Sequence, residues 1–241
     1  MSLTAQIVAR SLLPAQTAEE MLALHQRHFD GVERMRFFTD LEEKDWVILL
    51  LAADGRLAGF STQKLLSPVE ELGGARFLFS GDTIVERAHA NTPLLPGCFG
   101  HLMLRLMEQY GEESLYWFLI SKGFRTYRFL PVFFERFWPS SDHATPQAAQ
   151  RLIDAVARRK FGPAYDATSG LVRIAETDRL APSLAQIPPG RLDDRHVAFF
   201  LARNPGYARG DELACLAPIR RDNLNSYGRR VIRSTHPIWV C

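Results

Sequence analysis

The chain has 241 residues and is close to neutral, with 29 Lys and Arg against 27 Asp and Glu and a net charge of +2. A hydrophobic share of 46% and a charged share of 23% are typical of a globular protein and exclude a disordered or collagen-like chain. So small a net charge argues against a protein whose main task is to bind nucleic acid. The length predicts one large domain, or one domain with an insertion.

The cysteines, Cys98, Cys215 and Cys241, are odd in number, and none belongs to a CxxC motif. They predict free thiols in a reducing compartment. No apolar run reaches the length of a membrane span, and the first ten residues show no basic leader followed by an apolar segment. We therefore expect a cytoplasmic protein without a membrane span.

Hydrophobic patterning predicts alternating strands and helices in the first part of the chain. Residues 5–13 predict an opening strand, and Thr17 precedes a helix with one apolar face. Residues 46–53 form a continuous apolar run, which is typical of a strand buried on both faces. The Asp-Gly pair at 54–55 predicts a hairpin turn into a returning strand over residues 56–66.

A second group of elements follows. Residues 75–85 predict a strand with Gly81 in its interior, a position that often marks a β-bulge or a close backbone approach. A helix is expected to begin at residues 97–100, and residues 115–120 predict another buried strand. The aromatic-rich residues 132–137, which follow a proline, predict a further helix.

The last hundred residues are less regular. Residues 145–160 and 195–203 predict helices, and residues 212–218 predict a late strand. We expect residues 1–140 to form the core, and residues 141–241 to add a helical insertion and a late strand that completes the same domain.

The order of a hairpin, a third strand, a glycine-containing helix start and another buried strand resembles the GNAT superfamily of N-acyltransferases. The residues that carry the resemblance are 46–85, 97–100 and 115–139. It implies an α/β fold with a mixed, mostly antiparallel central sheet flanked by helices, here with a C-terminal extension or insertion. It also implies that the strand ending at residue 85 separates from the next one, and that the pantetheine arm of a thioester lies in the gap.

The helix start at residues 97–100 is the predicted pyrophosphate site, because main-chain amides and the helix dipole together attract anions. The family pattern places Arg or Gln three residues before Gly-x-Gly or Gly-x-Ala. Here the two glycines are three residues apart, and the nearest preceding cation is Arg87. The donor implied is an acyl-CoA or the acyl-phosphopantetheine of an acyl carrier protein, the latter as in the autoinducer synthases and N-acyl amino acid synthases. This departure, together with the length of the C-terminal hundred residues, favours a longer acyl chain over acetyl-CoA. The cofactor contacts implied are Ile84, Val85, Arg87, Gly97, Cys98, Phe99 and Gly100.

Amide formation from a thioester needs a neutral amine, an oxyanion stabiliser and a proton acceptor. Asp82, beside Gly81, is the first candidate for the proton acceptor, and Glu86 is the second. A main-chain N–H around Ile84 and Val85 is the candidate for the oxyanion. The alternative is that Asp82 only satisfies the amides of a bulge.

Residues 121–128 are the densest polar and aromatic cluster, and they follow a strand directly, where a sheet places ligands. The resemblance implies that Tyr127 protonates the departing thiolate. The predicted substrate contacts are Ser80, Lys122, Arg125, Thr126 and Arg128. The alternative is a solvated turn with its basic side chains outside. The aromatic residues that follow are predicted to be core rather than the wall of an acyl tunnel.

Two alternatives to direct acyl transfer to an amino acid, peptide or small amine remain open. One is a covalent thioester hydrolase or acyltransferase, in which Cys98 at a helix start is paired with His101. The other is a non-catalytic GNAT-like module that binds an acyl group or a partner protein. No metal is predicted, because His25 and His28 have no third ligand nearby in the sequence.

Overall fold

The fold is built around a central β-sheet. The structure, a computed structural model, describes residues 3–174 and 178–241. The strands are β1 (Leu3–Ala9), β2 (Phe29–Asp30), β3 (Trp46–Ala52), β4 (Leu57–Val69), β5 (Ala75–Val85), β6 (Leu115–Ser121), β7 (Tyr165–Asp166), β8 (Leu171–Val172), β9 (Arg179–Leu180), β10 (Glu212–Pro218) and β11 (Ile238–Val240). Among the described residues, nine strands form one sheet in the order β11-β1-β3-β4-β5-β6-β10-β8-β7. The β1–β11 and β5–β6 pairs are parallel and the others antiparallel, which confirms the predicted fold class.

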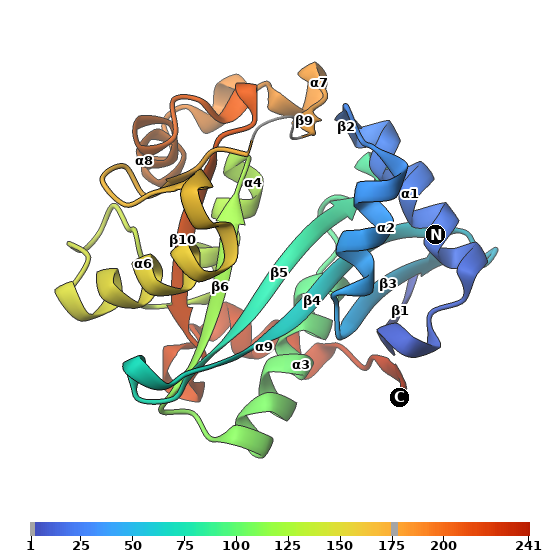
Figure 1. Cartoon of the computed structure of the whole chain (residues 1–241). Coiled ribbons are helices and arrows are strands. Elements are labelled where there is room, and N and C mark those ends of the chain that lie inside the picture. Colours follow the sequence, from blue (N-terminus) through green and yellow to red (C-terminus); the bar gives the residue numbers. More distant parts are fainter. Residues whose placement is uncertain (1–2, 175–177) are drawn as a thin grey trace.

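Helices cover both faces of this sheet (Figure 1). They are α1 (Ala15–His28), α2 (Arg34–Glu42), α3 (Leu94–Tyr110), α4 (Phe124–Tyr127), α5 (Phe129–Phe133), α6 (Gln147–Phe161), α7 (Pro182–Ala185), α8 (Arg195–Arg203) and α9 (Ser226–Ser234). Side chains alternate along β5, so Phe77 and Phe79 pack with α6 while Leu78 packs with α3. The helices α1 and α2 share the face of α6, and α9 shares the face of α3. The sheet therefore lies between two helical layers.

Many sequence predictions coincide with these elements. The predicted strands at 75–85 and 212–218 and the helix at 195–203 are confirmed as β5, β10 and α8. The hairpin is also confirmed, since Gly55 has a φ of 81° and its N–H donates to the carbonyl of Ala52 at 2.9 Å. A positive φ is the reason that glycine suits this turn.

The predicted helix at residues 132–137 is wrong. The helical turns α4 and α5 come earlier, and Phe134 instead forms a β-bridge with Leu224. The N–H of Glu135 donates to the carbonyl of Asn223 at 2.9 Å, so this segment takes its hydrogen bonds from a distant part of the chain. The helices α2 and α9 were not predicted, because each has nine residues with few apolar positions and depends on tertiary packing.

The parallel pair β5–β6 opens where the sheet is irregular. Its register runs from Arg76 opposite Leu115 to Ser80 opposite Leu119, and ends there although both strands continue. On the other edge of β5, two residues, Gly81 and Asp82, lie opposite a single residue of β4. Such a β-bulge bends and twists a strand. Figure 1 shows β5 and β6 diverging beyond this point.

The C-terminal residues complete both the sheet and the helical layer. Strand β10 pairs with β6, and β11 pairs with β1. Helix α9 crosses the beginning of α3 so closely that a Cβ on Gly100 would lie 2.2 Å from Cγ1 of Ile232. In the part of the chain that the structure describes, no helix has the length and hydropathy needed to cross a membrane.

Candidate active site

Two cavities lie on opposite faces of the sheet and meet where β5 and β6 diverge. Gly81 and Ile120, directly after the last β5–β6 pair, line both of them. Cavity 1, on the α3 side, is also lined by Ser61, Gln63, Ser80, Thr83, Leu95, Pro96, Phe99, Met103, Trp117, Leu119, Thr126, Phe129, Phe133, Phe134, Leu224 and Ile232. Cavity 2, on the α1 side, is also lined by His25, Val32, Glu33, Arg36, Phe37, Asp40, Phe79, Asp82, Lys122, Lys160, Phe161, Ile174, Asp178 and Glu212. Gly81 and Ile120 thus lie between the two cavities.

Cavity 1 is a narrow apolar slot of about 40 Å3 with a polar floor. On this floor the indole N–H of Trp117 donates to Oγ of Ser80 at 2.9 Å, and Ser80 Oγ donates to Oε1 of Gln63 at 2.7 Å. Gln63 Nε2 then donates to Oγ of Ser61 at 2.7 Å, and Ser61 lies 2.7 Å from the hydroxyl of Thr83. These polar groups satisfy one another, so they are held in fixed positions when no ligand is bound.

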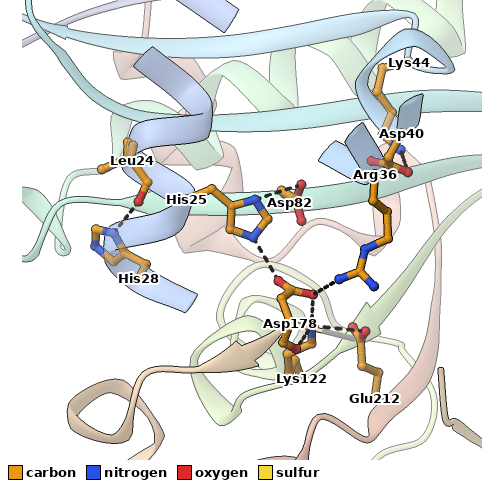
Figure 2. A network of polar contacts seen from close by, with 10 residues as sticks. All are labelled: Leu24, His25, His28, Arg36, Asp40, Lys44, Asp82, Lys122, Asp178 and Glu212. Carbon is orange, nitrogen blue, oxygen red and sulfur yellow. Dashed lines mark hydrogen bonds and ion pairs between the residues drawn. The ribbon is translucent and has the colours of Figure 1, made fainter. Parts of the chain in front are cut away.

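Cavity 2 is larger, about 210 Å3, and contains a charged network (Figure 2). His25, at the C-terminal end of α1, is 5% exposed and is packed edge-on against Phe29 and Phe37. Its Nε2 lies 2.9 Å from Oδ2 of Asp178, and its Nδ1 lies 3.6 Å from Oδ2 of Asp82. Burial lowers the pKa of His25, but the two carboxylates outweigh burial, and the pKa is raised. His25 is therefore an imidazolium over a wider pH range than an exposed histidine.

Asp82 stands at the bulge of β5, next to the junction of the cavities. Burial raises its pKa, the charges of Asp40 and Asp178 act in the same direction, and the His25 charge opposes them. Its side chain is 31% exposed, so it remains open to the cavity. A carboxylate with a raised pKa is a better proton acceptor than an ordinary aspartate.

Lys122, Asp178 and Glu212 form the other end of the network. The Lys122 ammonium lies 2.9 Å from Oδ1 of Asp178 and 3.6 Å from Oε1 of Glu212. Burial would raise the pKa of Asp178, but the hydrogen bond with His25 and the charge of Lys122 outweigh burial and hold that pKa well below its usual range. Burial raises the pKa of Glu212 to about 7 despite the charge of Lys122. Lys122, a predicted substrate contact, thus lines cavity 2 and is bound to carboxylates.

Sequence reasoning missed His25, Asp178 and Glu212 as site residues. His25 was considered only as a metal ligand, whereas it bridges two carboxylates that are far away in the sequence. Its neighbour His28 bonds to the carbonyl of Leu24 at 3.0 Å and does not join the network. The one available signal was a histidine on the apolar face of a helix. Asp178 and Glu212 carry no local motif.

Three predicted residues on or after β5 lie away from the junction. Ile84 and Val85 pair in regular register with Phe60 and Gly59 of β4, and line neither cavity. Pairing with β4 uses only one edge of β5, and β5 continues past its last pair with β6, so the expectation that these amides hold the oxyanion stays a prediction. Glu86 is bound by Arg56 at 2.8 Å and lines neither cavity, so it is not placed to accept a proton from a substrate there.

The predicted pyrophosphate loop is instead a packing contact. Gly97 and Gly100 lie inside α3, and a Cβ on Gly97 would lie 2.0 Å from Oγ1 of Thr235. These glycines allow α9 to approach, so they do not face a ligand. The adjacent Phe99 lines cavity 1, and its contact with the donor stays a prediction.

The covalent alternative fails on the environment of Cys98. Its side chain is fully buried, and burial raises its pKa to about 12, so the thiol is not ionised near neutral pH. His101 Nε2 lies 2.7 Å from the carbonyl of Thr235 and 3.0 Å from that of Ile232. His101 thus holds the end of α9 against α3, and Cys98 is a residue of the hydrophobic core.

The fold places the members of the polar and aromatic cluster at residues 121–128 in different surroundings. Tyr127 is fully buried, and its hydroxyl donates to the carbonyl of Pro139 at 2.9 Å, so its predicted role as proton donor is corrected. Arg128 is ion-paired with Asp194 at 3.1 Å and lines neither cavity. Thr126 lines cavity 1. The preceding Arg125 is exposed, and burial together with the nearby charge of Arg87 lowers its pKa.

The described residues contain no group of three or more His, Cys, Asp or Glu side chains placed to hold a metal ion. The charged network is instead balanced internally by histidine, lysine and arginine. The chemistry that this arrangement supports is therefore proton transfer and charge stabilisation by side chains.

No protein-family model matches the sequence, and no curated protein matches it. Among solved structures, the chain is similar to the GNAT family N-acetyltransferase YhbS from Escherichia coli in complex with CoA, with 16% identity, coverage of 51% of this chain and 65% of that chain, and a TM-score of 0.38. It is also similar to Arabidopsis thaliana NAA60 in complex with acetyl-CoA, with 10% identity, 56% and 87% coverage, and a TM-score of 0.41. A probable N-acyltransferase from Enterococcus faecalis gives 13% identity, 57% and 33% coverage, and a TM-score of 0.42.

The matched region thus spans less than two thirds of the length of the Escherichia coli and Enterococcus faecalis chains. These neighbours are acetyltransferases or acyltransferases rather than autoinducer synthases. With TM-scores below 0.5, these similarities do not assign an activity to this chain.

Proposed function

We propose that the chain is an N-acyltransferase, which moves an acyl group from a thioester in cavity 1 to an amine in cavity 2 by direct attack. The observation that carries this proposal is the meeting of two cavities from opposite faces of the sheet at Gly81 and Ile120. A thioester carbonyl at this junction is accessible from both sides. Holding two reactants in such contact replaces an encounter in solution, which accounts for a large part of many rate enhancements.

The donor side suits the thioester end of the donor with a short acyl group. Its walls are apolar, and its polar floor offers hydrogen-bonding groups in fixed positions. A volume of about 40 Å3 has room for roughly three water molecules. This supports a short acyl group, and a long chain would require Phe129 and Phe133 to move.

The phosphate groups of the donor have a separate candidate site. Arg87 and Arg125 lie close enough for the charge of Arg87 to lower the pKa of Arg125, and Arg125 precedes Thr126, which lines cavity 1. Guanidinium groups bind phosphate oxygens well. Both CoA and the phosphopantetheine of an acyl carrier protein carry phosphate, so this pair suits either donor.

In the proposed reaction the amine nitrogen attacks the thioester carbonyl carbon, and the bond between carbon and sulfur breaks. The nitrogen loses its proton to the carboxylate of Asp82, and the sulfur leaves as a thiolate that is then protonated. His25 is a positioning residue, because it is held by Asp178 and faces Asp82. The bulge at Gly81 and Asp82 supplies the candidate amides for the oxyanion, since a β-bulge leaves one residue unpaired.

The test is release of free thiol from acetyl-, octanoyl- and palmitoyl-CoA in the presence of a panel of amines, with product identified by mass. Asp82→Asn should lower turnover about a hundredfold, because a positioned base typically contributes that much. The matched control is Glu86→Gln, which changes a carboxylate near the end of the same strand but outside both cavities, and should retain turnover.

Equal turnover of Asp82→Asn and the unmodified protein would remove Asp82 from the mechanism. Binding of a thioester without transfer to any amine would favour the non-catalytic module. An acyl adduct on Cys98 would restore the covalent alternative. Transfer that requires an acyl carrier protein and fails with every CoA ester would identify the donor.

A further inference from the structure

Two ammonium groups lie around the ring of Phe79, which lines cavity 2. Lys160, at the end of α6, lines the cavity and its Nζ lies 4.5 Å from the centroid of the Phe79 ring. Lys44 Nζ lies 5.6 Å from the same centroid, and its side chain is 1% exposed. Two positive charges therefore gather around one aromatic ring, close to the junction of the cavities.

The positive charges of these two lysines are not equally neutralised by nearby carboxylates. Lys44 Nζ lies 2.6 Å from Oδ1 of Asp40, whereas among the described residues no carboxylate lies within 4.0 Å of Lys160 Nζ. Burial, followed by the charge of Lys44, lowers the pKa of Lys160. A partly buried cation without a counter-ion is costly, and an anion brought into the cavity would offset that cost.

A second unsatisfied group lies beside the junction. Thr62 is 1% exposed, and its Oγ1 has no hydrogen-bond partner in the described part of the chain. A Cβ placed on Gly81 would lie 2.6 Å from this hydroxyl and 3.4 Å from Lys44 Nζ. Glycine at this position thus keeps space open beside a lysine and a hydroxyl that has no partner.

The lining of cavity 2 also contains carboxylates. Asp82 and Glu212 are carboxylates in a site that already holds His25 and Lys122. An ammonium group is attracted there, and Asp82 lies next to the point where the thioester would be attacked. The cavity therefore offers a carboxylate for an amine, Asp82, and an ammonium for an anion, Lys160.

We infer that the acceptor is an amine that also carries an anionic group, of the kind found in α-amino acids, with its amine at Asp82 and its anion at Lys160. This inference rests on the proposed function, whose acceptor it specifies. An amine with several positive charges is disfavoured, because it would meet Lys44 and Lys160. Carboxylate and phosphate share the required chemistry, and the panel below separates them.

The test begins with binding, measured by calorimetry on the full chain without a donor. The panel contains amino acids, the same compounds as carboxamides, the corresponding amines without the acidic group, and phosphoethanolamine. We expect the acids to bind at least about tenfold more tightly than their carboxamides, because a charge-assisted contact is lost in the latter. Tighter binding of phosphoethanolamine than of every carboxylate would assign the anion as phosphate.

Lys160→Met should remove this preference by weakening the acid about tenfold and leaving the carboxamide unchanged, while Lys160→Arg should preserve most of it. Lys64→Met is the matched control, since Lys64 is paired with Asp45 at 2.9 Å and lines neither cavity. In the transfer assay, Lys160→Met should raise KM for the acid about tenfold with kcat within about twofold.

Equal affinity for acids and carboxamides, equal losses of both in Lys160→Met, or no binding of any member of the panel would overturn the inference. Preferential binding of acids without thiol release from any donor would overturn the proposed function and leave the anion site standing. The two failures are thus distinguishable.

Discussion

Cavity 1 and cavity 2 lie back to back across the same pair of diverging strands, and they differ in how their polar groups are satisfied. On the floor of cavity 1, Trp117, Ser80, Gln63 and Ser61 form an uninterrupted chain of hydrogen bonds. In cavity 2, Lys160 has no counter-ion among the described residues and Nδ1 of His25 has no hydrogen-bond partner. Polar side chains whose hydrogen bonds are already satisfied give a rigid cavity of fixed shape. Unsatisfied charges leave interaction energy available for a ligand.

The largest effect is expected from closing the junction between the cavities. Gly81→Val would place methyl groups where the two reactants meet, beside Thr62 and Lys44. Turnover should fall by about a hundredfold or more, because a small displacement of reacting atoms is costly. Binding of a thioester and of an amine, each measured alone, should persist.

Gly190→Val is the control for this change, since nothing lies within 4 Å of a Cβ at Gly190. Its turnover should equal that of the unmodified chain. If Gly81→Val transferred acyl groups at the normal rate, the junction would not be the reaction site.

The charge imbalance of cavity 2 should appear in the pH dependence of stability. Glu212 has a pKa of about 7 in the folded chain against 4.5 for an unperturbed side chain, so the folded state binds more protons between these values. Its contribution is present below about pH 4.5 and is lost as the pH rises through 7. The raised pKa of His25 acts with the same sign.

The free energy of unfolding, from urea titrations, should therefore fall between pH 5 and pH 8, with Glu212 accounting for about 3 kcal/mol. Glu212→Gln should flatten this slope, since the amide does not titrate. Asp178, whose pKa is lowered, loses its contribution only in more acidic solution. A stability that rises from pH 5 to pH 8 would contradict the assignment.

A smaller loss, in stability and in thioester binding, is expected from breaking the row of hydrogen bonds on the floor of cavity 1. Gln63 is 1% exposed and bonds to both Ser61 and Ser80, so Gln63→Met removes one hydrogen bond from each of two buried hydroxyls. We expect a loss of about 1–3 kcal/mol in the free energy of unfolding, together with weaker thioester binding. Gln16→Met, on the surface of α1, should change neither quantity; equal stability of the two variants would show that the floor is not rigidly bonded.

The smallest effect on activity is expected at Cys98. Cys98→Ala should keep turnover within about twofold while lowering the melting temperature, because it removes a fully buried side chain from the core. Iodoacetamide should label the exposed Cys241 and leave Cys98 unmodified in the folded chain. Loss of activity in Cys98→Ala with an unchanged melting temperature would instead indicate covalent catalysis.

Local patterns were sufficient for elements that depend on their own residues. The strands β5 and β10 and the helix α8 match the predicted bounds, because continuous apolar runs and helical periodicity are contained in short segments. Asp82 and the irregularity at Gly81 were also expected from a single strand, and Asp82 lies in cavity 2 as a candidate.

Patterns that depend on a distant partner led to errors. Gly97 and Gly100 have the composition of an anion-binding turn, but α9, about 130 residues away, occupies the space beside them. Tyr127 has the residue type of a proton donor but is buried against Phe199 and Phe200 of α8. A glycine suits an anion-binding turn as well as a close helix contact, and a tyrosine suits a proton donor as well as a core residue. Only tertiary packing distinguishes these roles.

By itself, the sequence determined an α/β chain with buried strands at about residues 46–53, 75–85 and 115–120, because burial on both faces requires apolar side chains in uninterrupted runs. Only the tertiary structure decided which charges meet. His25, Asp82, Asp178 and Glu212 come from four separate segments, and their pKa shifts arise from burial and from one another's fields over a few ångströms. No local pattern encodes such a field, because it exists only once the sheet has brought these segments together.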